Sequence, residues 1–454
     1  MNFDQINHIH FVGIGGIGMS GLAGIVAGEG VAVSGCDLKR SAVTERLEDR
    51  GIPVSIGHDP AHLDGVDLLV VTSAVRGHNP EVSTARVRRI RVMKRAELLG
   101  EIVNGHRSIG IAGTHGKTTT SAMVACILDE AGLDPTVLIG GVLRNFGTNA
   151  RRGSGEYLVV EADEYDRTFH YLHPEIAVVT NIEPDHLEYY GSFEAIVEAF
   201  GLFLEGIAPG GLVIGCVDDP AVAKLLARPL QRVVRYGLSE PAELRATNVD
   251  FSDRGSSFDV PGVGFFRLFV PGEHNVRNAL AAIGVARELG IDPATIAAAL
   301  AKFLGVDRRF QILGDYAGAT IVDDYAHHPT EIRATLEAAR RAYPGRRLVA
   351  LFQPHLYSRT RDFAGEFAEA LAIADVPIVA PIYAAREQPI EGISARLIAD
   401  AAPGIEFLDR SNAQIFNEMR RRLRAGDVFI TMGAGDVNEI AEMLVRGDGP
   451  GEEE

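Results

Sequence analysis

The residues best suited to chemistry form one short run, Gly113-Thr114-His115-Gly116-Lys117-Thr118-Thr119. An apolar strand-like stretch (109–112) precedes it, and apolar residues at helical spacing follow it from 123 to 131. A strand, a glycine loop with Lys-Thr and a helix together form a cradle for phosphates. The lysine adds a cation, and the Thr118 hydroxyl can ligate Mg²⁺. The first glycine of G-x-x-x-x-G-K-[ST] is replaced by Ile111. We predict a nucleotide phosphate site; the alternative is a glycine-rich turn that happens to contain a lysine.

Polar residues follow two further predicted strands. Glu161 ends the strand at 157–160, and Asn181 and His186 follow the strand at 176–180. The carboxyl ends of parallel strands lie together, so these side chains can converge on the phosphates held by Lys117. Thr118, Glu161 and His186 would then form a mixed oxygen and nitrogen site for Mg²⁺, with the imidazole as the less certain ligand. The alternative is a solvated carboxylate and a loop histidine.

A second glycine loop lies near the start of the chain. A strand at 8–12 runs into Gly13, Gly15 and Gly18 in G-x-G-x-x-G spacing, and Asp37 ends the next strand. This pattern predicts a diphosphate seat at a helix N-terminus and a carboxylate for a ribose hydroxyl. It fits NAD or a UDP-sugar equally well, and a tight turn without a ligand is the remaining alternative. The strand from 68 to 75 ends in small and polar residues, among them Ser73, where such folds bind ligands.

Two clusters in the second half of the chain are also polar. His274 and Asn278 are four residues apart and can share one face of a helix, where they could bind a planar base or cap the helix. Three polar residues, Asp324, His327 and His328, follow a strand at 319–322. Zinc at these histidines would need further ligands, and no convincing set is present.

Composition excludes several classes of function. The net charge of −17 makes a nucleic-acid backbone an unfavourable partner. No apolar run reaches about 18 residues, and the first residues lack a basic stretch, so we expect no membrane span and no secretory signal. Three widely spaced cysteines fit a reducing cytoplasm.

Strands and helices alternate along most of the chain, which predicts an α/β fold with parallel sheets. The stretch from 244 to 270 alternates apolar and polar residues and predicts additional strands. A length of 454 residues fits about three domains.

The motifs, taken in order, resemble those of the Mur ligases of peptidoglycan synthesis. The matching pieces span residues 13–436 and read GIGGIGMSGLA, SGCDLKRSAVTERL, GTHGKTTT, EADEYD, TNIEPDHLEYY, GEHNVRNALAA, RRFQ, DDYAHHPTEI, FQPHLYSRTRDF and TMGAGD. The resemblance implies a Rossmann-like UDP-sugar domain (1–105), a central P-loop ATPase domain (106–308) and a Rossmann-like amino-acid domain (309–454). The loop with Ile111 is then the G-T-x-G-K-T-T variant that this family uses.

The resemblance also implies roles for individual residues. ATP would be bound by Gly113, Thr114, His115, Gly116, Lys117, Thr118, Thr119, His274, Asn278, Arg309 and Asp324. The UDP-sugar would be bound by Gly15, Gly16, Ile17, Gly18, Ser20, Asp37, Ser73 and Asn181. The amino acid would meet Tyr325, His327 and Arg359, and the catalytic set would be Lys117, His186, His327 and Arg359.

The implied reaction is ATP-driven amide formation with UDP-N-acetylmuramate and L-alanine as substrates. The muramoyl carboxylate attacks the γ-phosphate, and the amine then attacks the acyl phosphate, with His327 as the candidate base. A murein tripeptide is the alternative acceptor. We expect Mg²⁺ as cofactor, no membrane or nucleic-acid partner, and a monomer or weak homodimer.

Two positions depart from the family pattern. Tyr165 stands where many relatives have serine in EADESD, close to the predicted metal loop. Leu356 stands where some relatives have an arginine that could hold the alanine carboxylate. This change places more of that task on Arg359.

Overall fold

The structure is a computed structural model that describes residues 6–72, 75, 78–252, 255–385 and 387–447. The chain divides into two compact units. One contains the described residues up to Thr247, with Asp259–Phe265 and Arg277–Phe303; the other contains Asn248–Phe258, Phe266–Val276 and the residues from Leu304 on. None of the described helices is both long enough and apolar enough to cross a membrane.

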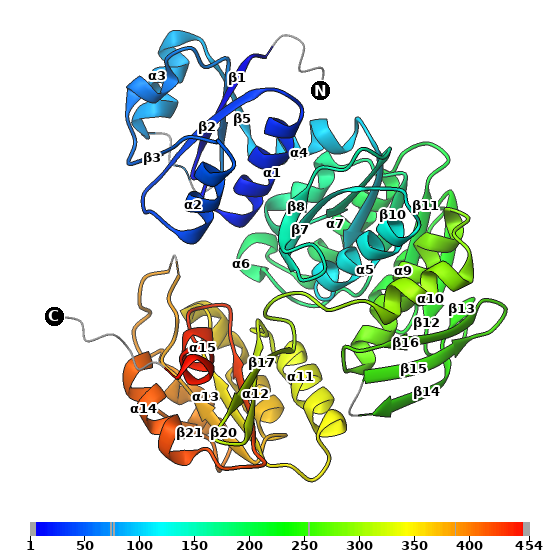
Figure 1. Ribbon diagram of the computed structural model, residues 1–454, viewed down its shortest axis with the longest axis vertical. Coiled ribbons are helices and arrows are strands. Elements are labelled where there is room, and N and C mark those ends of the chain that lie inside the picture. The colour runs from blue at the N-terminus through cyan, green and yellow to red at the C-terminus, as the bar shows by residue number, and fades with distance from the viewer. Residues whose placement is uncertain (1–5, 73–74, 76–77, 253–254, 386, 448–454) are drawn as a thin grey trace. The chain divides into compact units, whose positions relative to one another are not determined.

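The first unit begins with a five-stranded sheet in the order β3-β2-β1-β4-β5, in which all pairs are parallel (Figure 1). Its elements are β1 (His8–Val12), α1 (Ile17–Gly28), β2 (Ala32–Asp37), α2 (Ala42–Asp49), β3 (Val54–Ile56), η2 (Pro60–Leu63), β4 (Leu68–Val71), α3 (Pro80–Arg88), β5 (Arg91–Lys94) and α4 (Arg95–Val103). This order places the glycine loop at the carboxyl end of the central strand β1, as expected for a Rossmann-like fold.

The same unit contains an eight-stranded sheet in the order β13-β12-β11-β10-β6-β9-β7-β8, parallel except for the pair β7–β8. Its strands are β6 (Arg107–Ala112), β7 (Thr136–Leu143), β8 (Thr148–Arg151), β9 (Tyr157–Glu161), β10 (Ile176–Val179), β11 (Leu212–Cys216), β12 (Arg232–Gly237) and β13 (Leu244–Arg245). Its helices are α5 (Lys117–Glu130), η3 (Tyr165–Tyr171), α6 (Leu187–Tyr190), α7 (Phe193–Glu205), α8 (Pro220–Leu225) and α10 (Pro293–Ala301). Because β9, β6 and β10 are adjacent, their carboxyl ends bring Glu161, the Lys117 loop and Asn181 to one edge.

The stretch after β13 confirms the prediction of additional strands. Strands β14 (Thr247–Ser252), β15 (Gly255–Val260) and β16 (Gly264–Leu268) form a three-stranded sheet, and α9 (Glu273–Glu288) follows it.

The last sheet has the order β17-β18-β22-β19-β20-β21. Its elements are β17 (Gln311–Tyr316), β18 (Ala319–Asp324), α11 (Pro329–Ala342), β19 (Leu348–Phe352), α12 (Tyr357–Leu371), β20 (Val376–Val379), α13 (Arg396–Ala401), β21 (Glu406–Phe407), α14 (Asn412–Arg422), β22 (Val428–Met432) and α15 (Asn438–Arg446). Sequence analysis missed β17, which pairs antiparallel with β18 and bulges between Ile312 and Gly314.

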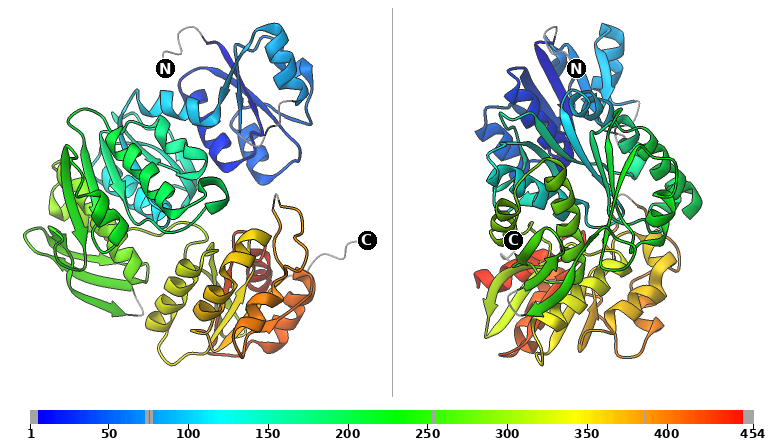
Figure 2. Two further views of the ribbon diagram at one scale, coloured as in Figure 1. Left: turned by 180° about the vertical axis from the view of Figure 1, so that it is seen from behind. Right: turned by 90° about the vertical axis from the view of Figure 1, so that its right-hand side faces the viewer.

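Helices cover both faces of this last sheet (Figure 2). Leu348, Ala350 and Phe352 of β19 pack into the cluster that contains α11 and α12, whereas Val349 and Leu351 pack into the cluster that contains α14 and α15. A strand buried on both faces reads as a continuous apolar run, which explains why β19 and β22 were predictable from sequence.

Candidate active site

The central glycine loop has a backbone that only glycine can form at two positions. Gly116, which caps α5, has φ 84°, and a Cβ there would lie 2.6 Å from Oδ1 of Asn278. Gly113 has φ 134°, and a Cβ there would lie 2.0 Å from the Thr180 hydroxyl. The loop is therefore tightly packed by its neighbours, and it leads into the N-terminus of α5, where an anion is predicted to bind. Asn278 lies directly against the loop.

The end of β10 holds this loop in place. Asn181 accepts a hydrogen bond from the His115 N–H (2.8 Å) and donates one to the His115 carbonyl (3.0 Å). The Thr180 hydroxyl donates to the same carbonyl at 2.6 Å. Both polar atoms of the Asn181 amide thus contact the glycine loop that precedes α5, and its binding of the sugar remains a prediction.

Lys117 is held by a partner that the sequence analysis did not identify. Its Nζ donates to both carboxylate oxygens of Glu164 (2.7 and 2.9 Å) and to the Gly113 carbonyl (2.6 Å). Burial alone would lower the pKa of Lys117, but Glu164, Asp163 and Glu161 outweigh this effect and raise it. Lys117 is therefore an ammonium near neutral pH, and Glu164 and the Gly113 carbonyl fix its position beside the loop. The only signal for Glu164 was its place three residues after Glu161 in the strand-end motif.

Thr118 and Glu161 lie together. The Thr118 hydroxyl is near enough to the Glu161 carboxylate to lower its pKa, and this carboxylate accepts the Gly140 N–H. Burial raises the pKa of Glu161, against the lowering effects of the Gly140 N–H, the Lys117 charge and Thr118. A hydroxyl and a carboxylate, both oxygen donors beside the phosphate loop, match the ligands that Mg²⁺ prefers. These two members of the predicted metal set fit the ion.

His186, the third predicted ligand, lies at the start of α6 with φ 54°. Its ring is 5.0 Å from the ring of Tyr165, and its Nε2 is 3.7 Å from Asp185. Tyr165 also lies 6.2 Å from the Tyr189 ring. Tyr165, which departs from the family pattern, therefore contacts the His186 ring with its own ring, and a serine could not make this contact.

The first glycine loop has different surroundings. The Gly15 N–H donates to Asp37 at 2.8 Å, and the Leu38 N–H donates to its other oxygen at 2.7 Å. Gly16 caps α1, in which Ser20 bonds back to the Ile17 carbonyl. Ser73 lies outside the described residues.

Arg95 is a cation beside this first loop that sequence analysis missed. A Cβ at Gly18 would lie 2.8 Å from the Arg95 guanidinium, which shows how closely the arginine approaches the loop. Arg95 begins α4, far away in sequence, and no local pattern indicates it. An arginine in this position suits a diphosphate.

A third cluster lies in the other unit, around β18. Asp324 accepts the N–H groups of Phe310 and Ala326, each at 2.8 Å. Burial raises the pKa of Asp324 to about 6, although the charge of Arg309 and these two N–H groups lower it. Arg309 lies 3.4 Å from Glu331 and 5.4 Å from the centre of the Tyr325 ring.

His327 lies next to this cluster. Its Nδ1 is 3.0 Å from the Tyr325 carbonyl and 3.3 Å from Glu331. A carbonyl can only accept, so Nδ1 carries a proton and Nε2 is the basic nitrogen. The rings of His327 and His355 lie 6.1 Å apart, and sequence analysis did not select His355.

Arg359 is 7% exposed and lies in the first turn of α12. Leu356, which precedes this helix, has φ 73° and is also buried. The leucine therefore packs inward at the position where an arginine occurs in some relatives. His274 lies in the first turn of α9, four residues before Asn278.

The site combines a lysine-containing glycine loop, held by residues that follow β10, with a threonine and a glutamate nearby. This combination is typical of α/β enzymes that use a nucleoside triphosphate. Comparisons with known proteins identify the family within this class. Three family models match the chain: Mur ligase family, catalytic domain (8–107); Mur ligase middle domain (111–286); and Mur ligase, glutamate ligase domain (308–435). The chain belongs to the Mur ligase family.

Among curated relatives, UDP-N-acetylmuramate–L-alanine ligase of Kineococcus radiotolerans is 47% identical over 97% of this chain and 96% of its own length. The enzyme of the same name from Burkholderia cenocepacia is 46% identical, over 97% of this chain and 98% of that one. The crystal structure of UDP-N-acetylmuramate–alanine ligase from Thermotoga maritima matches with a TM-score of 0.83 and 31% identity, covering 97% and 98% of the two chains. A murein peptide ligase from Psychrobacter arcticus matches with a TM-score of 0.72 and 28% identity, covering 97% and 98%.

Proposed function

We propose that this chain joins L-alanine to the carboxylate of UDP-N-acetylmuramate, using ATP and releasing ADP and phosphate. The observation that carries the proposal is the ion pair between half-buried Lys117 and buried Glu164, with Thr118 and Glu161 nearby at one edge of the central sheet. The full-length similarity to enzymes that are named for this reaction selects the substrates. The three predicted domains, with boundaries near residues 105 and 308, remain part of the proposal, as does the monomer or weak homodimer. ATP as a substrate favours the cytoplasm.

The ATP loop supplies charge neutralisation and position rather than a covalent nucleophile. The Lys117 ammonium and the N–H groups of the loop hold the phosphates. The muramoyl carboxylate attacks the γ-phosphorus, which forms an acyl phosphate and ADP. Thr118, Glu161 and His186 are the proposed Mg²⁺ ligands, and the ion, when bound, offsets the negative charge of the phosphates.

The second half of the reaction forms the amide. The alanine amine attacks the acyl carbonyl, and the carbon–oxygen bond to phosphate breaks. We assign the amine proton to Nε2 of His327, the basic nitrogen defined by the Tyr325 carbonyl contact. Arg359 is assigned to the alanine carboxylate, and His274, Asn278, Arg309 and Asp324 to ATP. Gly15 to Ser20, Asp37, Ser73 and Asn181 are assigned to the sugar nucleotide.

The test measures phosphate release by the purified chain with ATP, Mg²⁺ and UDP-N-acetylmuramate. L-Alanine, glycine, L-serine and the tripeptide L-alanyl-γ-D-glutamyl-meso-diaminopimelate are compared as acceptors. The proposal predicts the highest kcat/KM with L-alanine, at least about tenfold above the tripeptide. Release that requires the tripeptide would instead assign the chain to the recycling reaction, and no release with any acceptor would contradict both.

A further inference from the structure

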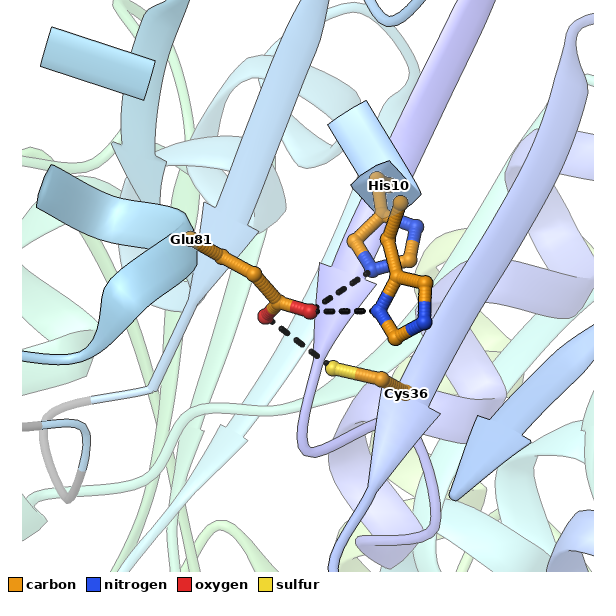
Figure 3. Close-up of side chains that lie close together, drawn as sticks. His10, Cys36 and Glu81 are labelled. Carbon is orange, nitrogen blue, oxygen red and sulfur yellow. Dashed lines mark hydrogen bonds and ion pairs between the residues drawn. The ribbon is translucent and has the colours of Figure 1, made fainter. Parts of the chain in front are cut away.

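The Rossmann-like domain contains a buried cluster of metal-ligating side chains that the ligase reaction does not use. His10 comes from β1, Cys36 from β2, His62 from η2 and Glu81 from the first turn of α3. One donor atom from each lies within 4.8 Å of the other three. Figure 3 shows His10, Cys36 and Glu81 pointing toward one another.

The spacing of the donor atoms approaches that of a tetrahedral ion. Oε1 of Glu81 lies 2.7 Å from Nδ1 of His62 and 3.9 Å from Nε2 of His10. The Cys36 sulfur is 3.2 Å from the other oxygen of Glu81. Zinc bonds of about 2.0–2.3 Å place tetrahedral ligand atoms about 3.3–3.8 Å apart. Small side-chain shifts would therefore complete the coordination.

A network of hydrogen bonds alone accounts poorly for this cluster. The side chain of Glu81 is fully buried; it accepts the Asp59 N–H at 3.2 Å and contacts His62 and Cys36, but a buried carboxylate charge is costly unless an opposite charge is also present. His10 is 1% exposed, and its Nε2 faces the cluster without a hydrogen-bond partner. A buried imidazole nitrogen without a hydrogen-bond partner, aimed at a carboxylate and near a thiol, is the arrangement of a metal ligand.

The surrounding residues orient these ligands. Nδ1 of His10 lies 2.8 Å from the Ser34 hydroxyl, which leaves Nε2 directed into the cluster. His58 lies at the edge, with Nδ1 3.3 Å from the Cys36 sulfur and 3.4 Å from Glu81. The contact between Nδ1 of His10 and Ser34 is of the kind that fixes the ring orientation and the tautomer of a ligating histidine.

We propose that this domain binds a structural divalent transition-metal ion, zinc by the chemistry of its donors, through His10, Cys36, His62 and Glu81. Thiol, imidazole and carboxylate donors together select zinc over magnesium. Binding forms a metal–sulfur bond and releases the Cys36 thiol proton to solvent, and the proton shared by Nδ1 of His62 and Glu81 moves to Nε2 of His62 or to solvent; no oxidation or reduction takes place. The ion neutralises the Glu81 carboxylate and ties two strands to two helical segments.

The site is also connected to the first glycine loop. The Cys36 carbonyl accepts hydrogen bonds from the Gly13 N–H (2.8 Å) and the Ile14 N–H (3.0 Å). A metal that fixes Cys36 therefore fixes the loop, and its removal is expected to lower thermal stability first and nucleotide-sugar affinity second.

The experiment uses the untagged full-length protein. Mass spectrometry for metals is expected to find one zinc per chain, and chelation is expected to lower the unfolding midpoint until zinc, but not magnesium, is returned. Cobalt substitution is expected to produce a thiolate-to-cobalt charge-transfer absorption. Cys36→Ser should abolish this absorption, and Glu81→Gln and His62→Ala should weaken zinc binding at least about tenfold.

The chain provides matched controls, because Cys126 and Cys216 are also buried, unpaired cysteines. Cys126→Ser and Cys216→Ser should retain both the absorption and the zinc. An unchanged absorption in Cys36→Ser would overturn the proposal, as would a protein that neither retains zinc nor gains stability from it. If circular dichroism shows that Cys36→Ser does not fold, zinc binding by Glu81→Gln and His62→Ala tests the proposal instead.

Discussion

The two glycine loops of the first unit share one backbone plan and differ in the side chains around it. Each follows a central parallel strand, β1 or β6, and leads directly into a helix, α1 or α5. At the first loop, Asp37 accepts an N–H of the loop and Arg95 approaches from outside. At the second, Lys117 is part of the loop and is fixed by Glu164, with Glu161 nearby. The backbone plan suits an anion in both cases, and we propose that the second loop, with Lys117 within it, acts on a terminal phosphate.

The largest effect is expected from Lys117→Ala. Loss of the loop cation should lower kcat by about 10³-fold, because the ammonium neutralises charge that develops on the transferred phosphate. Binding of UDP-N-acetylmuramate, measured by calorimetry, should be nearly unchanged because it depends on the other loop. Normal turnover would refute the role given to Lys117.

The same substitution leaves Glu164 buried without its cation, which can destabilise the protein independently of catalysis. The variant Lys117→Met with Glu164→Gln removes both charges and serves as the control. It should regain thermal stability but not activity.

Glu161→Gln should lower kcat by about 10²-fold and raise the Mg²⁺ concentration required for half-maximal rate. The amide can still accept the Gly140 N–H, so the change mainly removes charge from the proposed metal pair. Glu156→Gln, an exposed change just before the same strand β9, is the matched control and should behave like the wild type. An unaltered Mg²⁺ requirement in Glu161→Gln would remove this residue from the metal site.

Reciprocal glycine substitutions should separate the two loops. Gly116→Ala adds a Cβ 2.6 Å from Asn278 at φ 84° and should weaken ATP binding at least about tenfold, with little effect on the sugar nucleotide. Gly15→Ala adds a Cβ 2.8 Å from Asp37 and should have the opposite selectivity. Gly24→Ala within α1, where the nearest atom is 4.0 Å away, is the control. Equal losses of both ligands in both variants would contradict separate sites.

The smallest effect is expected in the pH dependence of thermal stability, through Asp324 in the cluster around β18. The pKa of Asp324 is raised from 3.8 to about 6 in the folded protein, so the protonated form is favoured by folding. This stabilisation is fully present below pH 3.8 and is lost as pH rises through about 6. Between pH 7.5 and pH 5 the wild type should therefore gain about 1 kcal/mol relative to Asp324→Asn. Thermal midpoints of both proteins across this range test the sign; a constant difference would contradict it.

The sequence was most informative where function depends on neighbouring residues. Lys117 and Thr118 follow Gly116 directly, and Glu161 ends a clear apolar strand, so all three were predictable. Glu164 and Arg95 were not, because the fold, rather than a local pattern, brings them to the loops. The strand order β9-β6-β10 was needed to see that Asn181 holds the His115 backbone.

The prediction of the fold was likewise limited to elements with a clear local sequence pattern. Buried parallel strands such as β19 and β22 appear as apolar runs, whereas β17 has mixed burial and a bulge that interrupt its period. The short strand β21 contains only Glu406 and Phe407, too few residues for a pattern.

The central claim is that the ATP loop makes an acyl phosphate of the sugar-nucleotide carboxylate. It is tested most directly with UDP-N-acetylmuramate labelled with ¹⁸O in that carboxylate, ATP and L-alanine. If the carboxylate attacks the γ-phosphorus and the amine later displaces phosphate, one labelled oxygen must leave with the phosphate. Each released phosphate should then contain one ¹⁸O; unlabelled phosphate formed together with the amide would contradict an acyl-phosphate intermediate.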